Sequence, residues 1–211
     1  MSQGSALTHL AYRSCLDALE DVLGTNGKNS VLRFANLENI IENPPDYDPD
    51  ARMKHEDTTR LFAGVREILG DGGYTVVMQQ GSVVMVKNVV SHSVPLQTLI
   101  DANLAPVEKL KVAYKAYLTI AGYDPEKVLE HLPESNEFVI HRPDCTECDD
   151  VLRSCGKMNG SCRRPSCSFI RGCLAEIGGC FNKEVEVSVV EEACRLIGDD
   201  ECRYRATYRV L

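Results

Sequence analysis

The sequence lacks the features that place a chain in a membrane or on an export route. None of its apolar runs reaches the roughly 18 residues that a membrane-spanning helix needs. Residues 1–10 contain neither the basic segment nor the apolar stretch of a signal peptide. We therefore expect a cytoplasmic protein with no membrane span.

An excess of basic residues is also missing, as are the motifs of the common enzyme classes. The 23 Lys and Arg residues are outnumbered by 31 Asp and Glu, which gives a net charge of −8. Because such a surface repels phosphate backbones, we do not expect direct binding to nucleic acid. The chain has no Ser-His-Asp arrangement, no phosphate-binding loop, and no flavin or nicotinamide motif that would deliver hydride. These absences favour a binding protein over an enzyme.

Apolar residues, at 44% of the 211, suffice for the core of one compact domain. Segment 74–90 fits either a strand or a buried helix, and both remain open. We expect an α/β (α+β) fold, with a helical N-terminal half packed on a small antiparallel sheet, as a single domain over residues 1–211. The spacing of apolar residues predicts helices at 6–23, 31–41, 57–69 and 103–120, and strands at 137–141, 184–190 and 202–210.

Cysteine is abundant, and nine of the ten cysteines lie between Cys145 and Cys202. A disulfide framework would explain this density in a secreted protein. In a cytosolic chain, however, the spacing Cys145-x-x-Cys148 indicates metal or redox chemistry, so we favour metal binding over structural disulfides. Cys15, Cys173 and Cys180 fit ordinary packing positions on apolar helical faces or turns.

The last two predicted strands indicate where a metal could bind. Glu191 shares the inward register of Val185, Val187 and Val189, and Cys202 shares that of Tyr204. A carboxylate that faces a core costs several kcal/mol unless it is paired or bound to a cation. With Cys194, and with Cys167 at the start of a predicted helix, these residues suit a closed tetrahedral zinc site. The alternative is a solvent-facing glutamate after a bulge, beside two ordinary buried cysteines.

The same region resembles a known family over about 45 residues. It contains, in order, the runs Cys167-Ser-Phe-Ile-Arg-Gly172, Glu191-Glu-Ala-Cys194, Gly198-Asp199 and Cys202-Arg-Tyr. This order resembles the vinyl-4-reductase (hydrocarbon-binding) domain, which is similar to the sensory domain of phenol-responsive transcriptional activators. The resemblance implies that Cys167, Glu191, Cys194 and Cys202 bind zinc. It also implies a fold like that of transport-particle subunits, a homodimer, and a small apolar ligand held between helices and sheet.

A further group of cysteines departs from that family pattern. Cys145, Cys148, Cys155 and Cys162 fall within a predicted inserted loop at residues 141–167. Four thiolates on one loop could hold a second zinc or a [4Fe–4S] cluster. The alternative is a loop whose cysteines form disulfides or stay free. His141 could act as a ligand, although a single histidine at a strand end is more often structural.

Three functional hypotheses follow from these patterns. The favoured one is a small apolar-ligand-binding or sensor module in which zinc has a structural role. The second is an iron–sulfur redox protein or reductase component that acts on a tetrapyrrole-like substrate. The third is an assembly or dimerisation protein without a small ligand. Because no DNA-binding segment is visible, any regulatory output would pass through another chain.

Overall fold

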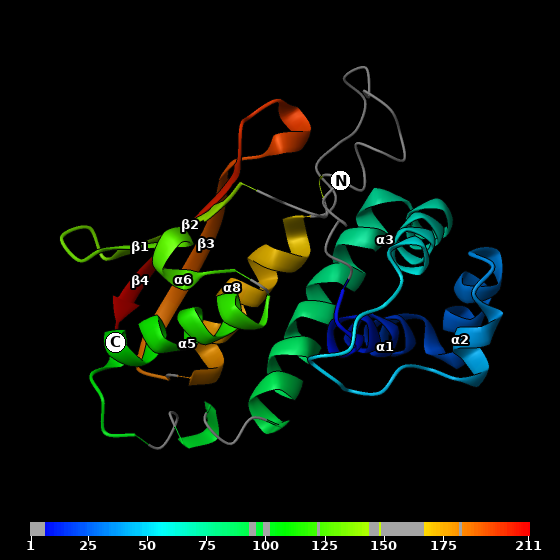
Figure 1. The fold of residues 1–211 in the computed structure, drawn as a ribbon, viewed down its shortest axis with the longest axis horizontal. Helices are drawn as coiled ribbons and strands as arrows, with labels where there is room; N and C mark the ends of the chain where they lie inside the picture. Colours follow the sequence, from blue (N-terminus) through cyan, green and yellow to red (C-terminus); the bar gives the residue numbers. More distant parts are fainter. Residues whose placement is uncertain are drawn as a thin grey trace.

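The computed structural model of the protein describes residues 7–92, 96–98, 102–121, 123–143, 148, 167–181 and 183–211. Its sheet has four antiparallel strands in the order β1-β2-β4-β3. The α1–α3 half and the sheet lie at opposite ends of the molecule, with α8 and α5 between them (Figure 1). The helices and strands are α1 (His9–Phe34), α2 (Glu38–Glu42), α3 (His55–His92), α5 (Pro106–Ile120), α6 (Pro125–Val128), β1 (Leu129–Leu132), β2 (Glu137–Arg142), α8 (Cys167–Phe181), β3 (Val185–Ala193), η1 (Arg195–Ile197) and β4 (Cys202–Val210).

The two long helices are each broken by a glycine. Gly24 in α1 and Gly70 in α3 have φ values of 69° and 66°, a left-handed conformation that glycine adopts without strain. The sequence predicts helix ends at both glycines, and the backbone does leave the helical conformation there before helix resumes. The ambiguous segment 74–90 is helical and forms the second half of α3.

The predicted strand pair at the C-terminal end is confirmed. β3 and β4 are antiparallel, with Val187 opposite Tyr208, and a bulge falls between Glu191 and Ala193. The inward register is also confirmed as far as Tyr208, because Cys202, Tyr204, Ala206 and Tyr208 are buried, whereas Val210 at the end of β4 is exposed. Oppositely charged side chains face each other on the outer side, where such exposed pairs add about 0–1 kcal/mol each.

Helix α8 connects the two ends of the molecule, since it packs on α3 at one side and on β3 at the other (Figure 1). Two glycines allow both contacts. A Cβ atom at Gly172 would lie 2.1 Å from Ser82 Oγ on α3, and one at Gly178 would lie 2.4 Å from Val187 Cγ2 on β3. From α5, the Tyr114 hydroxyl donates a hydrogen bond of 3.0 Å to a carbonyl of α8. The close approach of α8 therefore depends on the absence of side chains at two positions.

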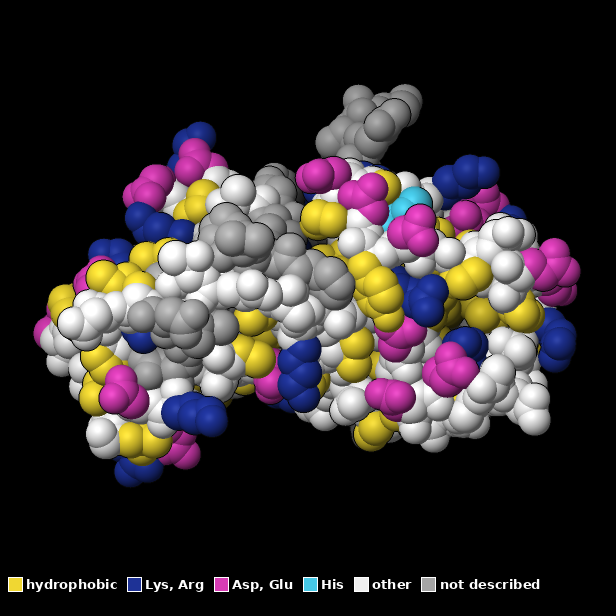
Figure 2. Space-filling model, turned by 90° about the horizontal axis from the view of Figure 1, so that it is seen from below, with side chains coloured by type: hydrophobic (Ala, Val, Ile, Leu, Met, Phe, Trp, Pro, Cys, Tyr) yellow, Lys and Arg dark blue, Asp and Glu magenta, His cyan; other side chains and the backbone are white. Residues whose placement is uncertain are grey.

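The expected architecture, a helical N-terminal half on a small antiparallel sheet, is confirmed. The single domain over residues 1–211 and the likeness to transport-particle subunits remain predictions. Among the described residues, no helix is both long and apolar enough to cross a membrane. Acidic and basic side chains intermingle over the face shown in Figure 2, so the net negative charge is not gathered there into one patch.

Candidate functional site

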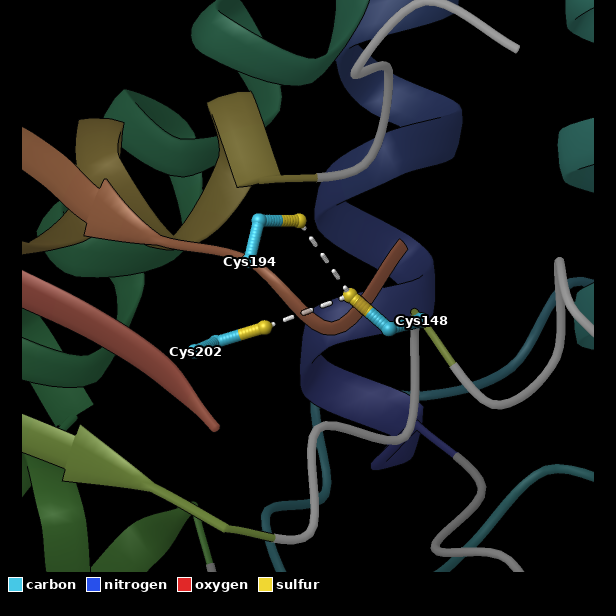
Figure 3. A group of neighbouring side chains, drawn as sticks. All are labelled: Cys148, Cys194 and Cys202. Carbon is cyan, nitrogen blue, oxygen red and sulfur yellow. Dashed lines mark hydrogen bonds between the residues drawn. The ribbon is translucent and has the colours of Figure 1, made fainter. Parts of the chain in front are cut away.

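Three cysteine side chains meet in the interior at the end of the sheet. The sulfur atoms of Cys148, Cys194 and Cys202 all lie within 4.8 Å of one another, and all three residues are 0% exposed. Cys148 Sγ lies 3.3 Å from Cys202 Sγ and 3.9 Å from Cys194 Sγ (Figure 3). A disulfide bond is about 2.05 Å long, so these sulfurs are in contact and not bonded. We refer to these three residues as the thiol cluster.

The turn between β3 and β4 positions two members of the thiol cluster. Cys194 follows β3 directly, and its backbone N–H donates to Asp199 Oδ2 at 2.7 Å. Gly198 closes the short helix η1 with a φ of 103°, which a side chain would disfavour. The chain then enters β4 at Cys202, whose sulfur accepts a hydrogen bond from the backbone N–H of Arg195 at 3.4 Å. The turn therefore places both sulfurs on its inner side.

The structure assembles only part of the site that the sequence predicts. It brings Cys194 and Cys202 together, but the Glu191 carboxylate does not belong to the group of ligand atoms within 4.8 Å. Cys167 begins α8, and its side chain lies outside the described residues. Cys145, Cys155 and Cys162, predicted as a second centre with Cys148, also lie outside them.

Cys148 is the member of the thiol cluster that sequence reasoning assigned elsewhere. It comes from the segment between β2 and α8, 46 residues before Cys194 and 54 before Cys202. The only signal in the sequence was the density of cysteines around it. Nothing in the spacing indicated that Cys148, and not another cysteine of that segment, reaches the β3–β4 turn.

His141, the other candidate ligand, lies near the cluster but makes a different contact. Its Nδ1 atom is 3.0 Å from Glu201 Oε1, and its Nε2 atom is 3.8 Å from Glu130 Oε2. This histidine lines an open cleft together with Tyr123. The Tyr123 hydroxyl accepts a hydrogen bond of 2.7 Å from the buried guanidinium of Arg142. His141 is therefore part of a surface ion-pair network and not of the thiol cluster.

An apolar cavity lies between the helices; the sequence resemblance implies an apolar ligand held between helices and sheet, but none of the residues that line this cavity was predicted. Its volume, measured as the space open to the centre of a water-sized sphere, is about 20 Å³. One water molecule needs roughly 10–15 Å³ on the same measure. The residues come from α3, α5, α8 and the segment after α3, and helix packing alone brings them together. They are Met85, Val86, Val89, Val90, Leu96, Ala113, Tyr117 and Ile177.

Carbon-rich side chains line this cavity. Ala113 and Ile177 are each 2% exposed, and they approach the cavity from α5 and α8, whereas Val89 and Val90 are half-buried. Among the described residues that line it, only Met85 and Tyr117 carry side-chain heteroatoms. An apolar space of this kind favours an apolar occupant, since water would find few hydrogen-bond partners in it.

The helical half, the four-stranded antiparallel sheet and the α8 connection define a mixed α/β domain, and comparison with solved structures shows which domains share it. An H-NOX structure described as probing the function of haem distortion matches with a TM-score of 0.60 at 12% identity, covering 97% of this chain and 95% of that one. The H-NOX protein from S. oneidensis in the Fe(II)NO ligation state matches with a TM-score of 0.59 at 12% identity, covering 96% and 99%.

A third H-NOX domain, described as oxygen-binding and related to soluble guanylate cyclases, was solved as its oxygen complex. It matches with a TM-score of 0.52 at 14% identity and covers 93% of this chain and 92% of that one. No protein-family model matches the sequence, and no curated protein matches it either. At these identities the likeness establishes a shared fold.

The comparisons correct three predictions made from the sequence. The resemblance to the vinyl-4-reductase domain and to phenol-responsive sensors is wrong, because the solved structures that share the fold are H-NOX proteins. The predicted hydrocarbon ligand is wrong as well, because those structures are described with oxygen or nitric oxide. The predicted cofactors, zinc and an iron–sulfur cluster, are also wrong, because the group named for these neighbours is haem. A motif of about 45 residues thus suggested a family that the whole fold does not support.

Proposed function

We propose that this protein is a sensory module that binds one small apolar molecule in the cavity between α3, α5 and α8. The observation that carries the proposal is the cavity itself, which is lined by apolar, mostly buried side chains from three helices. Most protein interiors are packed without spaces of this size, so a lined cavity in an otherwise dense core marks a candidate binding site.

The size of the cavity limits the class of ligand. Its roughly 20 Å³ holds the centre of only one or two water-sized spheres. This fits a molecule of two or three atoms and excludes a large aromatic ring unless the helices move. The fold supports the same class, because neighbours with this fold are described as an oxygen complex and as an Fe(II)NO state. We therefore propose a diatomic gas as the ligand class.

Haem does not fit the described residues that line this cavity. The macrocycle is many times larger than a cavity of about 20 Å³. Histidine and cysteine, the most familiar axial ligands of haem iron, do not occur among the eight described residues that line the cavity. Met85 and Tyr117 carry atoms that can bind haem iron, but they leave no slot for the ring. We therefore propose that the gas contacts the protein directly.

A route from the cavity to the sheet exists through α8. Ile177 lines the cavity, and the next residue, Gly178, lies against Val187 of β3. A molecule that displaces Ile177 would therefore also displace Gly178, which is already packed tightly against Val187. This arrangement suits a sensor, because small displacements in tightly packed interfaces are transmitted and not absorbed.

Xenon is a suitable probe because it occupies small dry cavities without needing hydrogen bonds. We expect dissolved xenon to shift the NMR signals of residues around Ala113 and Ile177, with smaller shifts reaching Val187. Substitution Ala113→Leu fills the cavity and should abolish these shifts. The matched control is Val112→Leu on the same helix, because Val112 is 41% exposed and faces away from the core.

Each outcome of this experiment supports or refutes the cavity as the binding site. Saturable shifts in the wild type and in Val112→Leu, but not in Ala113→Leu, support the cavity as the binding site. Equal shifts in all three proteins would show that xenon binds elsewhere. If the wild-type protein shows no shifts, that result alone refutes the proposal. Circular dichroism verifies that Ala113→Leu folds, since overpacking can cost about 1–3 kcal/mol.

A further inference from the structure

We propose that the open edge of strand β3, meaning the side of residues 185–190 that faces away from β4, docks an extended basic segment of a partner protein. β3 stands last in the strand order β1-β2-β4-β3, and among the described residues it pairs with β4 alone. An edge strand presents a row of backbone donors and acceptors to which another extended chain can bond. The docked segment adds a fifth strand to the sheet, and it needs no ligand in the helical cavity.

The hydrogen bonds of the sheet identify the backbone groups that face this edge. The Leu211 N–H donates to the Glu184 carbonyl at 2.8 Å, so the backbone of Glu184 points toward β4. Successive residues of a strand direct their N–H and C=O groups to opposite sides, so three residues of β3 point away from β4. They are Val185, Val187 and Val189. The neighbouring strand agrees, because the N–H of Tyr208, opposite Val187, donates to the Asn136 carbonyl on the β2 side at 2.9 Å.

The charges on the outer face of the sheet indicate the chemistry of the partner. Acidic and basic side chains alternate there from strand to strand, since Arg205 of β4 pairs with Glu137 of β2 on one side and with Glu192 of β3 on the other. Toward the other end of the strands, Arg209 of β4 pairs with Glu186 of β3. Because opposite charges on neighbouring strands are favourable and like charges are unfavourable, a fifth strand continues this alternation when its outward side chains are basic.

Side chains of β3 remain accessible to such a partner. The side chain of Glu186 is 62% exposed although it pairs with Arg209, and Val190 is 50% exposed. The regular edge ends at the bulge between Glu191 and Ala193, so the docked segment is short.

A second copy of this chain fits the edge less well than a basic partner. β3 contains three glutamates and neither lysine nor arginine. Two β3 strands side by side would therefore bring three glutamates from each copy to one seam, without a cation from either strand. Like charges across such a seam oppose pairing, whereas a lysine or arginine beside Glu186 favours it.

A synthetic peptide tests this docking site on the full-length chain. The peptide Lys-Val-Thr-Val-Thr-Val-Lys, blocked at both ends, reads the same in both directions and presents both lysines on one face of a strand. We expect saturable binding, with NMR shifts and slowed hydrogen exchange at the amides of Val185, Val187 and Val189. The amides of Glu186 and Ser188, which the same alternation directs to β4, should change less.

Two control peptides separate strand pairing from attraction to an acidic protein. The first has glutamate in place of both lysines. The second has the same composition as the probe but adjacent lysines, which a strand places on opposite faces. Each control should bind at least about tenfold more weakly than the probe, because it loses or reverses the charge pairs across the seam.

Variants of the protein test the edge from the other side. Glu186→Lys should weaken binding of the lysine peptide by about tenfold and strengthen binding of the glutamate peptide. The matched control is Glu67→Lys, which changes the net charge equally at an exposed position of α3. Val189→Pro removes one N–H from the open edge, where proline is compatible with the ladder to β4, and should also weaken binding.

Weaker binding of the lysine peptide to Glu186→Lys than to the wild type and Glu67→Lys, with shifts at the three edge amides, supports the docking site. Equal affinity for all three peptides, shifts elsewhere, or no binding of the lysine peptide would overturn it. If Val189→Pro does not fold, Glu186→Lys still decides, because it changes an exposed side chain. Dimerisation of the peptide-free chain with the same three amides protected would assign the edge to a second copy and overturn the basic partner.

Discussion

The thiol cluster and the helical cavity are opposite kinds of site within one core. The cluster brings three polarisable sulfur atoms within 4.8 Å of one another, with Cys148 Sγ at 3.3 and 3.9 Å from the other two. The cavity brings together carbon-rich side chains and leaves a space of about 20 Å³ that they do not fill. The cluster is a close contact between side chains of the protein itself, whereas the cavity is suited to a neutral molecule held by contact alone.

This contrast suggests a division of labour along the molecule. Residues of the cluster come from three points that span 54 residues of chain, so their contact helps to hold the fold together. The cavity lies where α3, α5 and α8 meet, and a gas molecule there contributes little binding energy but can displace α8. If the division holds, disturbance of one site should leave the other intact.

A side chain placed between α8 and the sheet should give the largest change in stability. Gly178→Ala places a Cβ atom 2.4 Å from Val187 Cγ2 and 2.8 Å from Val187 Cβ, so the backbone must move. We expect a loss of about 1–3 kcal/mol in the free energy of unfolding, measured by denaturant titration.

The neighbouring glycine gives a matched control. A Cβ atom at Gly179 meets no heavy atom within 4 Å, on the same helix and one residue away. Gly179→Ala should therefore be neutral or stabilising by up to about 1 kcal/mol, because alanine restricts the unfolded chain more than glycine. Equal destabilisation by both variants would show that helix propensity, and not contact with β3, controls this position.

Local patterns in the sequence predicted the sheet well. Alternation along residues 184–190 and 202–210 gave both strands, their antiparallel pairing and the inward register of Cys202, because side chains in a strand alternate between its faces. The same rule placed Glu191 on the inner face, and the structure half-buries it there. The rule could not show whether the carboxylate reaches the cysteines, since a bulge follows Glu191.

Features that depend on tertiary packing could not be predicted in this way. Segment 74–90 is apolar on more than one side because α3 contacts both α1 and α8, which removes the periodicity that separates helix from strand. Cys148 reaches its partners across 46 and 54 residues, and no local spacing encodes that contact. The cavity likewise exists only where three helices and the segment after α3 pack imperfectly.

The comparison of the two sites also predicts that haem does not bind in the cavity. Because the cavity is too small for a macrocycle and its eight lining residues include neither histidine nor cysteine, hemin added to the folded protein should not bind there. We expect no sharp Soret band, no quenching of tyrosine fluorescence beyond the inner-filter effect, and unchanged xenon shifts. A stoichiometric Soret band that is lost in Ala113→Leu but kept in Val112→Leu would show that the helices open to admit haem. In that case the gas would bind to an iron centre and not directly to the protein. A Soret band equal in both variants would indicate adsorption of hemin to the surface.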